Sequence, residues 1–315
     1  MDDVRTEADG VILVRELAAI GVGDRQLRTS SNDGHLARLR RGAYVSSAQL
    51  ARASDDDLYD LRMSAVLATR RSVVVLSHYS ALRAWGIPIV NPWPRDVHLT
   101  IPVDSGIRSR NWVVAHRHPL DPDQVTEREG RMLTSLLRTL VDIARTSPFR
   151  DAVAAIDAAL HAGVIDKSAL LEELARSVPS QGTSRARRAI EFASPLAMLP
   201  GESFSRVLMH ELRFPAPTLQ HEFCLQKGGR RFADFWWEEL SLAGEFDGRR
   251  KYFDPKFANG QSAEDLLWQE KLRENQLRDL GAQLTRWTWS DLELVTPFIR
   301  RLEAAGLRRS RPGPR

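Results

Sequence analysis

The sequence predicts an α+β protein built of several domains. Its 315 residues are enough for two or three hydrophobic cores. Near the N-terminus, helical patterns lead into an alternating apolar and basic segment that is typical of a β-ribbon. Around residues 232–246, short aromatic-rich apolar runs favour strands. We therefore expect four parts, with boundaries at 1–50, 51–181, 182–307 and a basic tail at 308–315.

The composition is that of an ordinary globular protein, with 43% hydrophobic and 27% charged residues. No run approaches the roughly 20 apolar residues of a membrane span, and the acidic start lacks the layout of a signal peptide. We therefore expect a cytoplasmic protein without a membrane partner. The single cysteine, Cys224, excludes an intrachain disulfide and a zinc cage built of cysteines.

The cationic residues are uneven in kind. Net charge is only +4, yet lysine supplies five of the 45 Lys and Arg residues. A GC-rich genome would produce this bias without any functional reason. Phosphate recognition would also favour arginine over lysine, because the guanidinium group can donate two parallel hydrogen bonds to phosphate oxygens. The clustering of the arginines has to separate these two explanations.

The first domain has the order of a winged helix-turn-helix. Apolar positions at helical spacing over 11–20 predict a first helix that ends at Gly21. Asp24 is predicted to cap a second helix over 24–31, which stops at Asn32-Asp33-Gly34. The segment 35–47 predicts a small basic β-ribbon.

In such a domain the second helix enters the major groove of double-stranded DNA, and the ribbon contacts the backbone. The concentration of arginines over 25–41 favours DNA binding over the alternative of a solvated basic face. The residues predicted to face DNA are Arg25, Gln26, Arg28 and Thr29 on the helix, and Arg38, Arg40 and Arg41 on the wing.

The segment VRELAAIGVGDRQLRTSSNDGHLARLRRGAYV resembles the N-terminal winged-helix domain of the AbiEi family of antitoxins. The similarity continues through LSHYSALRAWGIP, DVHLTIP and RMLTSLLRTLVDIAR, and spans about residues 8–165. Members of that family bind promoter DNA and repress their own operons. The resemblance therefore implies a protein that reads DNA sequence, with a cognate toxin as a partner that could dock on the helical middle region.

The middle region is predicted to be α/β and then helical. Its polar residues point to structural roles. His116 and His118 lie two apart on one predicted strand, with His98 on the neighbouring strand, but no carboxylate or cysteine completes a metal site there. His78 has no acid at a triad-like position. The predicted elements are helices over 57–69 and 78–86, strands over 72–77, 96–102 and 111–118, and helices between Leu133 and Leu174.

Acidic residues occur within or just after the two strands predicted at FADFWW and SLAGEF. Glu245 and Asp247 are two apart and so project from the same face, and Asp234 lies on the adjacent strand. Such a carboxylate cluster is unfavourable unless a cation or proton neutralises it. Oxygen ligands of this kind suit Mg²⁺ or Mn²⁺.

The pattern Asp…Glu-x-Asp-Gly-x-x-Lys resembles the PD-(D/E)xK nucleases, in the branch near the very-short-patch-repair endonucleases. The similarity covers about residues 199–294. It implies a restriction-endonuclease-like α/β domain with a central mixed sheet, which hydrolyses DNA phosphodiesters in phage defence or DNA repair. Further matches to the family pattern fall on Glu202, Arg206, Glu270, Arg273, Leu277, Gly281, Arg286 and Asp291.

By this resemblance Asp234 and Glu245 hold the metal ion, and Glu202 adds either an outer-shell ligand or a ligand to a second metal ion. Asp247 stands where the common motif has lysine, so Lys251 is the candidate for the missing charge. Arg273, or else Lys271, is expected to contact the scissile phosphate. The competing interpretation is a decayed nuclease fold, in which Asp247-Gly248 only forms a turn and nearby arginines neutralise the acids.

Two functional hypotheses remain open. One is a metal-dependent DNA endonuclease that the winged helix targets. The other is an antitoxin-type transcriptional regulator whose C-terminal domain is catalytically inactive. The winged helix is common to both, and a dimer or larger oligomer is compatible with either.

Overall fold

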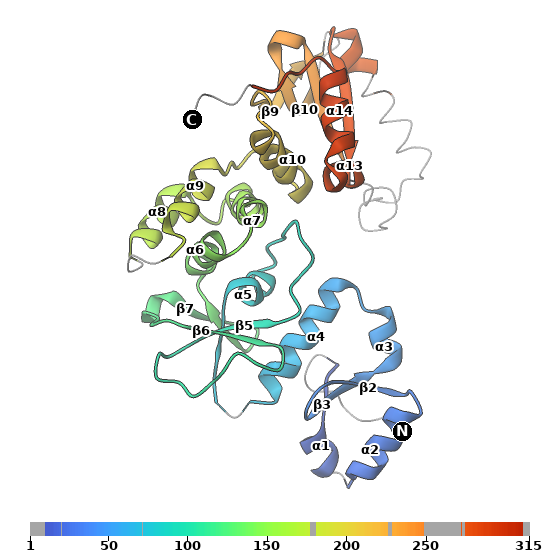
Figure 1. Cartoon of the computed structure of the whole chain (residues 1–315), viewed down its shortest axis with the longest axis vertical. Coiled ribbons are helices and arrows are strands. Elements are labelled where there is room, and N and C mark those ends of the chain that lie inside the picture. The colour runs from blue at the N-terminus through green and yellow to red at the C-terminus, as the bar shows by residue number, and fades with distance from the viewer. Residues whose placement is uncertain are drawn as a thin grey trace. The chain divides into compact units, whose positions relative to one another are not determined.

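The computed structural model describes residues 10–19, 21–70, 72–176, 181–225, 229–248, 272 and 275–310. It has the expected α+β class, with one antiparallel and two mixed sheets (Figure 1). Two compact units make up the chain: Met1–Ser147 with Ser168–Arg187, and Pro148–Lys167 with Arg188–Arg315. Among the described helices, none is both long and apolar enough to cross a membrane.

The start of the first unit is a small antiparallel sheet with two helices, in the strand order β1-β3-β2. The predicted ribbon is confirmed, and Gly42 adopts a positive φ of 88° in its tight turn. The elements are β1 (Ile12–Leu13), α1 (Val14–Ala19), α2 (Asp24–Asn32), β2 (Leu36–Arg40) and β3 (Ala43–Ser46).

Two details of the prediction for this part were wrong. Residues 12–13 are a strand and not helix, because they pair with Ala43 and Tyr44 of β3. The cap of α2 is Gly23, one residue before the predicted Asp24. The N–H of Gly23 donates to the Gln26 side chain at 3.2 Å. A residue of the first turn therefore supplies the hydrogen-bond acceptor for this backbone N–H at the helix start.

Helix α4 (Asp55–Ala68) follows the short helix α3 (Ser47–Arg52) and serves two cores of the first unit. Leu61 and Ala65 pack into the core of the three-stranded sheet. Tyr59, Met63 and Val66 lie on another face and pack into the core of the larger sheet. A helix that is apolar on two faces must be covered on both, so α4 joins the two layers.

The larger sheet of the first unit has five strands in the order β6-β5-β4-β8-β7, and is mixed. The strand predicted over 72–77 is confirmed only at Val75–Leu76 (β4). A β7–β8 hairpin, turned at Glu129 and Gly130 with positive φ, was not predicted. The other elements are α5 (His78–Ala84), β5 (Val97–Ile101), β6 (Val113–Arg117), β7 (Val125–Arg128), β8 (Arg131–Thr134), α6 (Leu136–Thr146) and α8 (Lys167–Arg176).

Helix α9 (Thr183–Phe192) runs from the first unit into the second, whose sheet has the strand order β12-β11-β10-β9. Strands β9, β10 and β11 are antiparallel neighbours, and β12 is parallel to β11. The two strands predicted around 232–246 are therefore confirmed. The elements are α7 (Phe149–His161), α10 (Pro200–Glu211), β9 (Thr218–Cys224), β10 (Arg230–Trp237), β11 (Leu242–Asp247), β12 (Gln283–Thr288), α13 (Trp289–Leu294) and α14 (Thr296–Ala304).

Aromatic side chains fill the core beside β11. Trp287 of β12 is fully buried, and its indole N–H donates to the Ser205 hydroxyl of α10 at 2.7 Å. Gly244 has no side chain to obstruct this ring, which lies directly over it. Strand β12 ends before Trp289, because Thr288 and Asp291 form a capping box that starts α13 there. Helix α10 and strand β11 are thereby held close together.

Candidate functional site

Helix α2 presents a polar face outward from the three-stranded sheet. Leu27 is 4% exposed and anchors the helix to its neighbours. Arg25, Gln26, Arg28 and Thr29 are exposed. The Thr29 hydroxyl donates to the Arg25 carbonyl at 3.1 Å, and Gln26 also caps the helix. The four residues predicted to face DNA from α2 therefore share one accessible surface.

The β2–β3 ribbon, which was predicted to be a wing, exposes two of its arginines to solvent and partly buries the third. Arg38 and Arg41 are exposed. Arg40 is partly buried, and burial together with the charge of Arg70 lowers the pKa of its guanidinium. An irregular register between Arg38 and Arg40 separates two residues that strand periodicity would place on one face. The interpretation of Arg40 as a side chain turned to DNA does not match this burial.

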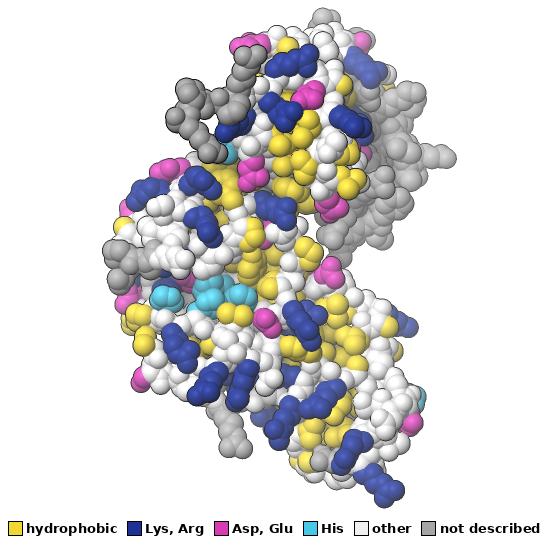
Figure 2. Space-filling view, viewed as in Figure 1, with side chains coloured by type: hydrophobic (Ala, Val, Ile, Leu, Met, Phe, Trp, Pro, Cys, Tyr) yellow, Lys and Arg dark blue, Asp and Glu magenta, His cyan; other side chains and the backbone are white. Residues whose placement is uncertain are grey.

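Figure 2 shows Lys and Arg side chains gathered over the end of the first unit that carries α2 and the wing. A single helix face and a wing tip therefore present positive charge together. Phosphate contacts need this arrangement, because they depend on the local density of cations and not on the net charge of the chain.

The acidic site of the second unit forms on neighbouring strands. Phe235 pairs with Gly244, so the next position along the register sets Asp234 of β10 opposite Glu245 of β11. The Asp234 carboxylate accepts the Phe246 backbone N–H at 3.0 Å and the Gln220 side-chain amide at 3.3 Å. The structure thus brings the two predicted metal ligands to one place, and it also gives Asp234 two protein donors.

Glu245 is 5% exposed and lies beside a cation that the sequence did not connect with it. Arg286 pairs with Glu245 across the parallel strands β11 and β12. Its Nε and Nη2 atoms lie 3.1 and 3.0 Å from Glu245 Oε2. This partner was missed because the register of a parallel pair is set by tertiary packing and cannot be read from spacing along the chain.

Glu202 is buried at the start of α10, where its carboxylate accepts the Met198 backbone N–H at 2.9 Å. Asp247 lies at the end of β11 and is partly exposed. Within the described parts of the chain, these acids do not form a group of three whose ligand atoms lie within 4.8 Å of one another. Lys251 and Arg273 lie outside the described residues, as does the alternative Lys271.

Mg²⁺ would rely on the two protein ligands that the sequence predicted. Asp234 and Glu245 are the residues that would hold it, and each already accepts hydrogen bonds from protein groups. A divalent ion prefers several oxygen ligands and keeps water where the protein supplies few. The pair fits a weakly held ion, and it does not form a dedicated cage.

Arg206, the other residue of the predicted family pattern on α10, forms a buried ion pair. It donates to Asp157 of α7 at 2.9 Å, and the Ser203 hydroxyl donates to the same oxygen at 2.7 Å. Burial raises the pKa of Asp157, although Arg206 and the hydrogen bonds oppose the shift. This arginine fastens one helix to another, and its position fits a structural role.

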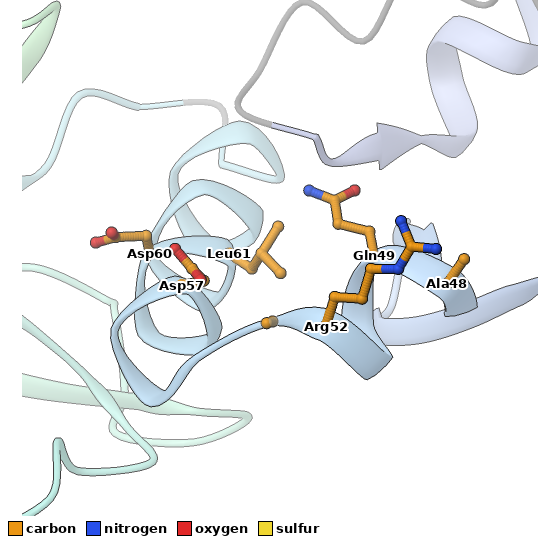
Figure 3. A pocket seen from close by; sticks show the side chains of 7 residues that line it. Ala48, Gln49, Arg52, Asp57, Asp60 and Leu61 are labelled. Carbon is orange, nitrogen blue, oxygen red and sulfur yellow. The ribbon is translucent and has the colours of Figure 1, made fainter. Parts of the chain in front are cut away.

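A pocket of about 480 Å³ lies between α3 and α4 in the first unit. Figure 3 shows Gln49 and Arg52 of α3 across from Asp57 and Leu61 of α4. Asp57 also accepts from the Ser54 backbone N–H and hydroxyl, which caps α4. None of the predicted site residues lines this pocket.

Sequence reasoning also missed a cluster of histidines. It grouped His98 with His116 and His118, and it treated His78 separately as a structural residue. The structure brings His78, His98 and His116 together. Next to this cluster, Asp142 pairs with an arginine, because Arg138 Nε lies 3.0 Å from both carboxylate oxygens.

No family model matches the sequence. Two proteins of Mycobacterium tuberculosis are similar to it, named uncharacterized protein MT2308 (strain CDC 1551 / Oshkosh) and uncharacterized protein Rv2248 (strain ATCC 25618 / H37Rv). Each is 27% identical over 277 residues, which cover 88% of this chain and 92% of the relative. The crystal structure of the RV2827C protein from the same species aligns with a TM-score of 0.41 and 17% identity, over 68% of this chain and 83% of that one.

Proposed function

We propose that this protein binds double-stranded DNA and reads its sequence through helix α2, as a transcriptional regulator does. The observation that carries the proposal is the exposed row of Arg25, Gln26, Arg28 and Thr29 above the buried Leu27. The antiparallel sheet β1-β3-β2 supports the helix and extends the wing beside it.

The two parts of this surface suit different tasks. Arginine and glutamine side chains on a helix in the major groove donate to base edges, and they discriminate one base from another. Arg38 and Arg41 at the wing suit phosphate oxygens, which fix position and carry no sequence information. Contacts with bases should therefore set specificity, while contacts with phosphates should set salt dependence.

A selection from random-sequence duplexes, followed by titration of the winning sequence at several salt concentrations, tests the proposal. Arg28→Ala should weaken binding to the selected site by roughly 5- to 150-fold and relax the sequence preference. Arg38→Ala should weaken all duplexes alike and reduce the salt slope by about 1. Arg300→Ala, which removes an exposed arginine from α14, should change neither.

The proposal would fail if no sequence were enriched, or if Arg300→Ala weakened binding as much as Arg28→Ala. The second outcome would mean that the arginines act only through total charge. Circular dichroism of each variant would confirm that the fold is intact before the affinities are compared.

A second candidate function is metal-dependent hydrolysis of DNA phosphodiesters. The placement of Asp234 opposite Glu245, on adjacent strands of a mixed sheet, favours it. When bound there, Mg²⁺ or Mn²⁺ would activate water and stabilise the charge on the phosphate. Arg286 beside Glu245 would orient that carboxylate, and Glu202 and Asp247 would act from outside the pair.

Cleavage of plasmid and linear duplexes with Mg²⁺ or Mn²⁺ tests this second function. Asp234→Asn and Glu245→Gln should each abolish cleavage and leave the affinity for the selected duplex within a few-fold. Glu239→Gln alters an exposed acid next to the same strands and should keep full activity. Cleavage that persists in both site variants would exclude this pair as the catalytic site, whereas DNA binding without any cleavage would leave the regulator as the function.

A further inference from the structure

Three histidines of the first unit converge from separate elements. His78 is the first residue of α5, His98 lies on β5 and His116 on β6. The parallel strands pair Thr100 with His116, so His98 and His116 are diagonal neighbours on one face of the sheet. One ring nitrogen from each residue lies within 4.8 Å of the other two.

The distances suit a common ligand. In a tetrahedral site with metal–nitrogen bonds of about 2.0–2.1 Å, two ligand nitrogens lie roughly 3.4 Å apart. Here His98 Nδ1 and His116 Nε2 are 2.9 Å apart and share a hydrogen bond. The ring of His78 stacks on His116 with centroids 3.6 Å apart and lies 5.7 Å from His98. All three nitrogens therefore lie within reach of one ion, which would widen the separation of the His98 and His116 nitrogens from 2.9 Å to about 3.4 Å.

The surroundings keep these rings in the form that binds metals. Burial lowers the pKa of His98 and of His116 to about 4, and lowers that of His78 as well. Neutral imidazole is the metal ligand, so protons compete little at neutral pH. The buried Arg138, whose charge also lowers the pKa of His78, is paired with Asp142.

His78 also has a hydrogen-bond partner outside the proposed site, and a carboxylate lies near the same nitrogen. Its Nδ1 lies 3.0 Å from the Ser77 hydroxyl and 4.0 Å from the Asp142 carboxylate. A hydroxyl or carboxylate at one ring nitrogen fixes the tautomer and turns the other nitrogen toward the ion. In His78 that leaves Nε2 for the site.

We propose that His78, His98 and His116 form a binding site for a divalent transition metal of the Zn²⁺ class, with three imidazole ligands and one open position. Three nitrogen donors favour Zn²⁺, Co²⁺ or Ni²⁺ over Mg²⁺ and Ca²⁺, which prefer oxygen. Figure 2 shows histidine side chains gathered at the molecular surface, and His98 and His116 are partly exposed. Water can therefore fill the open position.

This site is separate from the carboxylates of the second unit, and it does not depend on either proposed function. The test uses the full chain after treatment with a chelator. Titration with Zn²⁺ in a calorimeter should show one equivalent per chain. Titration with Co²⁺ should give the intense visible absorption of a four-coordinate nitrogen site.

Substitutions identify the ligands. His98→Gln and His116→Gln should each weaken Zn²⁺ binding more than about 100-fold, beyond the 10–100-fold that losing an outer partner costs. These two partly exposed residues are preferable to His78, whose replacement could unfold the core. His118→Ala changes an exposed histidine just beyond β6 and should bind one equivalent as tightly as the wild type.

Three outcomes would overturn the proposal. The wild type could bind no Zn²⁺, both glutamine variants could bind it undiminished, or His118→Ala could lose it as the ligand variants do. Thermal melting without metal, equal in the wild type and both glutamine variants, would show that lost binding reflects lost ligands and not lost structure.

Discussion

At the scale of single residues, burial separates side chains that the sequence treats as equivalent. Arg38, Arg40 and Arg41 form one basic run along the wing. Only Arg38 and Arg41 are exposed, and the buried Arg40 Nη1 has no hydrogen-bond partner among the residues that the structure describes. Partial burial of a positive charge costs desolvation free energy, and it leaves that charge less able to contact DNA phosphates.

We therefore expect Arg40→Ala to reduce affinity for duplex DNA much less than Arg38→Ala. The free energy of unfolding of the Arg40→Ala variant should equal or exceed that of the wild type, because an incompletely satisfied and partly buried cation is removed. Affinity at two salt concentrations and urea unfolding of both variants check this. Equal losses of affinity would show that Arg40 turns outward when DNA binds.

Asp291 gives a pH-dependent prediction. Burial opposes ionisation of its carboxyl group, but hydrogen bonds from the Thr288 N–H, the Arg301 guanidinium and the Thr288 hydroxyl outweigh this and lower the pKa. The unfolded chain has an Asp pKa near 3.9. Because the pKa is lower in the folded protein, ionised Asp291 stabilises the fold at pH values above 3.9, and this stabilisation is lost as the pH falls through the folded pKa.

Asp291→Asn should therefore cost roughly 1 kcal/mol of unfolding free energy at pH 7, as lost helix caps do. The difference from wild type should shrink as the pH falls from about 5 to 3. Urea unfolding at pH 7, 5 and 3.5 measures it, with Glu293→Gln as the exposed control on the same helix. A difference that stays constant with pH would show that the charge is not what matters.

At the scale of elements, a close approach of aromatic rings positions β11. A Cβ atom on Gly244 would lie 2.6 Å from the Trp287 ring and 2.9 Å from the Trp237 ring. Both rings are held by hydrogen bonds, to Ser205 and to the Pro215 carbonyl. Neither ring can move aside without breaking a buried interaction.

Gly244→Ala should consequently destabilise the second unit by about 1–3 kcal/mol, the usual cost of overpacking. It should also disturb the placement of the adjacent Glu245. Gly106→Ala, at a position with open space and no positive φ, serves as the matched control and should be nearly neutral. Unfolding by urea followed through tryptophan fluorescence gives both values, and equal stabilities would contradict the packing argument.

At the scale of the whole molecule, the second unit takes in a segment that precedes part of the first unit in sequence. Helix α7 belongs with α10 and the four-stranded sheet. Asp157 of α7 binds the Ser203 hydroxyl and the Arg206 guanidinium, and accepts the Ser194 N–H at 2.6 Å. Removal of α7 would leave these donors unsatisfied and expose an alanine-rich apolar face.

A fragment of residues 148–315 should therefore melt cooperatively, whereas a fragment of 188–315, which lacks α7, should not. Leaving a buried arginine without its partner costs about 3–5 kcal/mol, a large share of the stability of a small domain. Calorimetry of both fragments, with Asp157→Ala in the longer one, checks the cause. Equal melting of the two fragments would refute a structural role for α7 in this unit.

The sequence by itself determined the α+β class, helix α2 and its polar row, the basic wing and the two strands that carry Asp234 and Glu245. These features depend on local periodicity, turn residues and charge order, which a chain carries without folding. Tertiary structure alone decided the rest. It paired Glu245 with Arg286 and partly buried Arg40. It also placed α7 in the second unit and brought the three histidines together. Each of these results depends on strand register or on packing between segments far apart in sequence. Neither can be inferred from the spacing of residues along the chain.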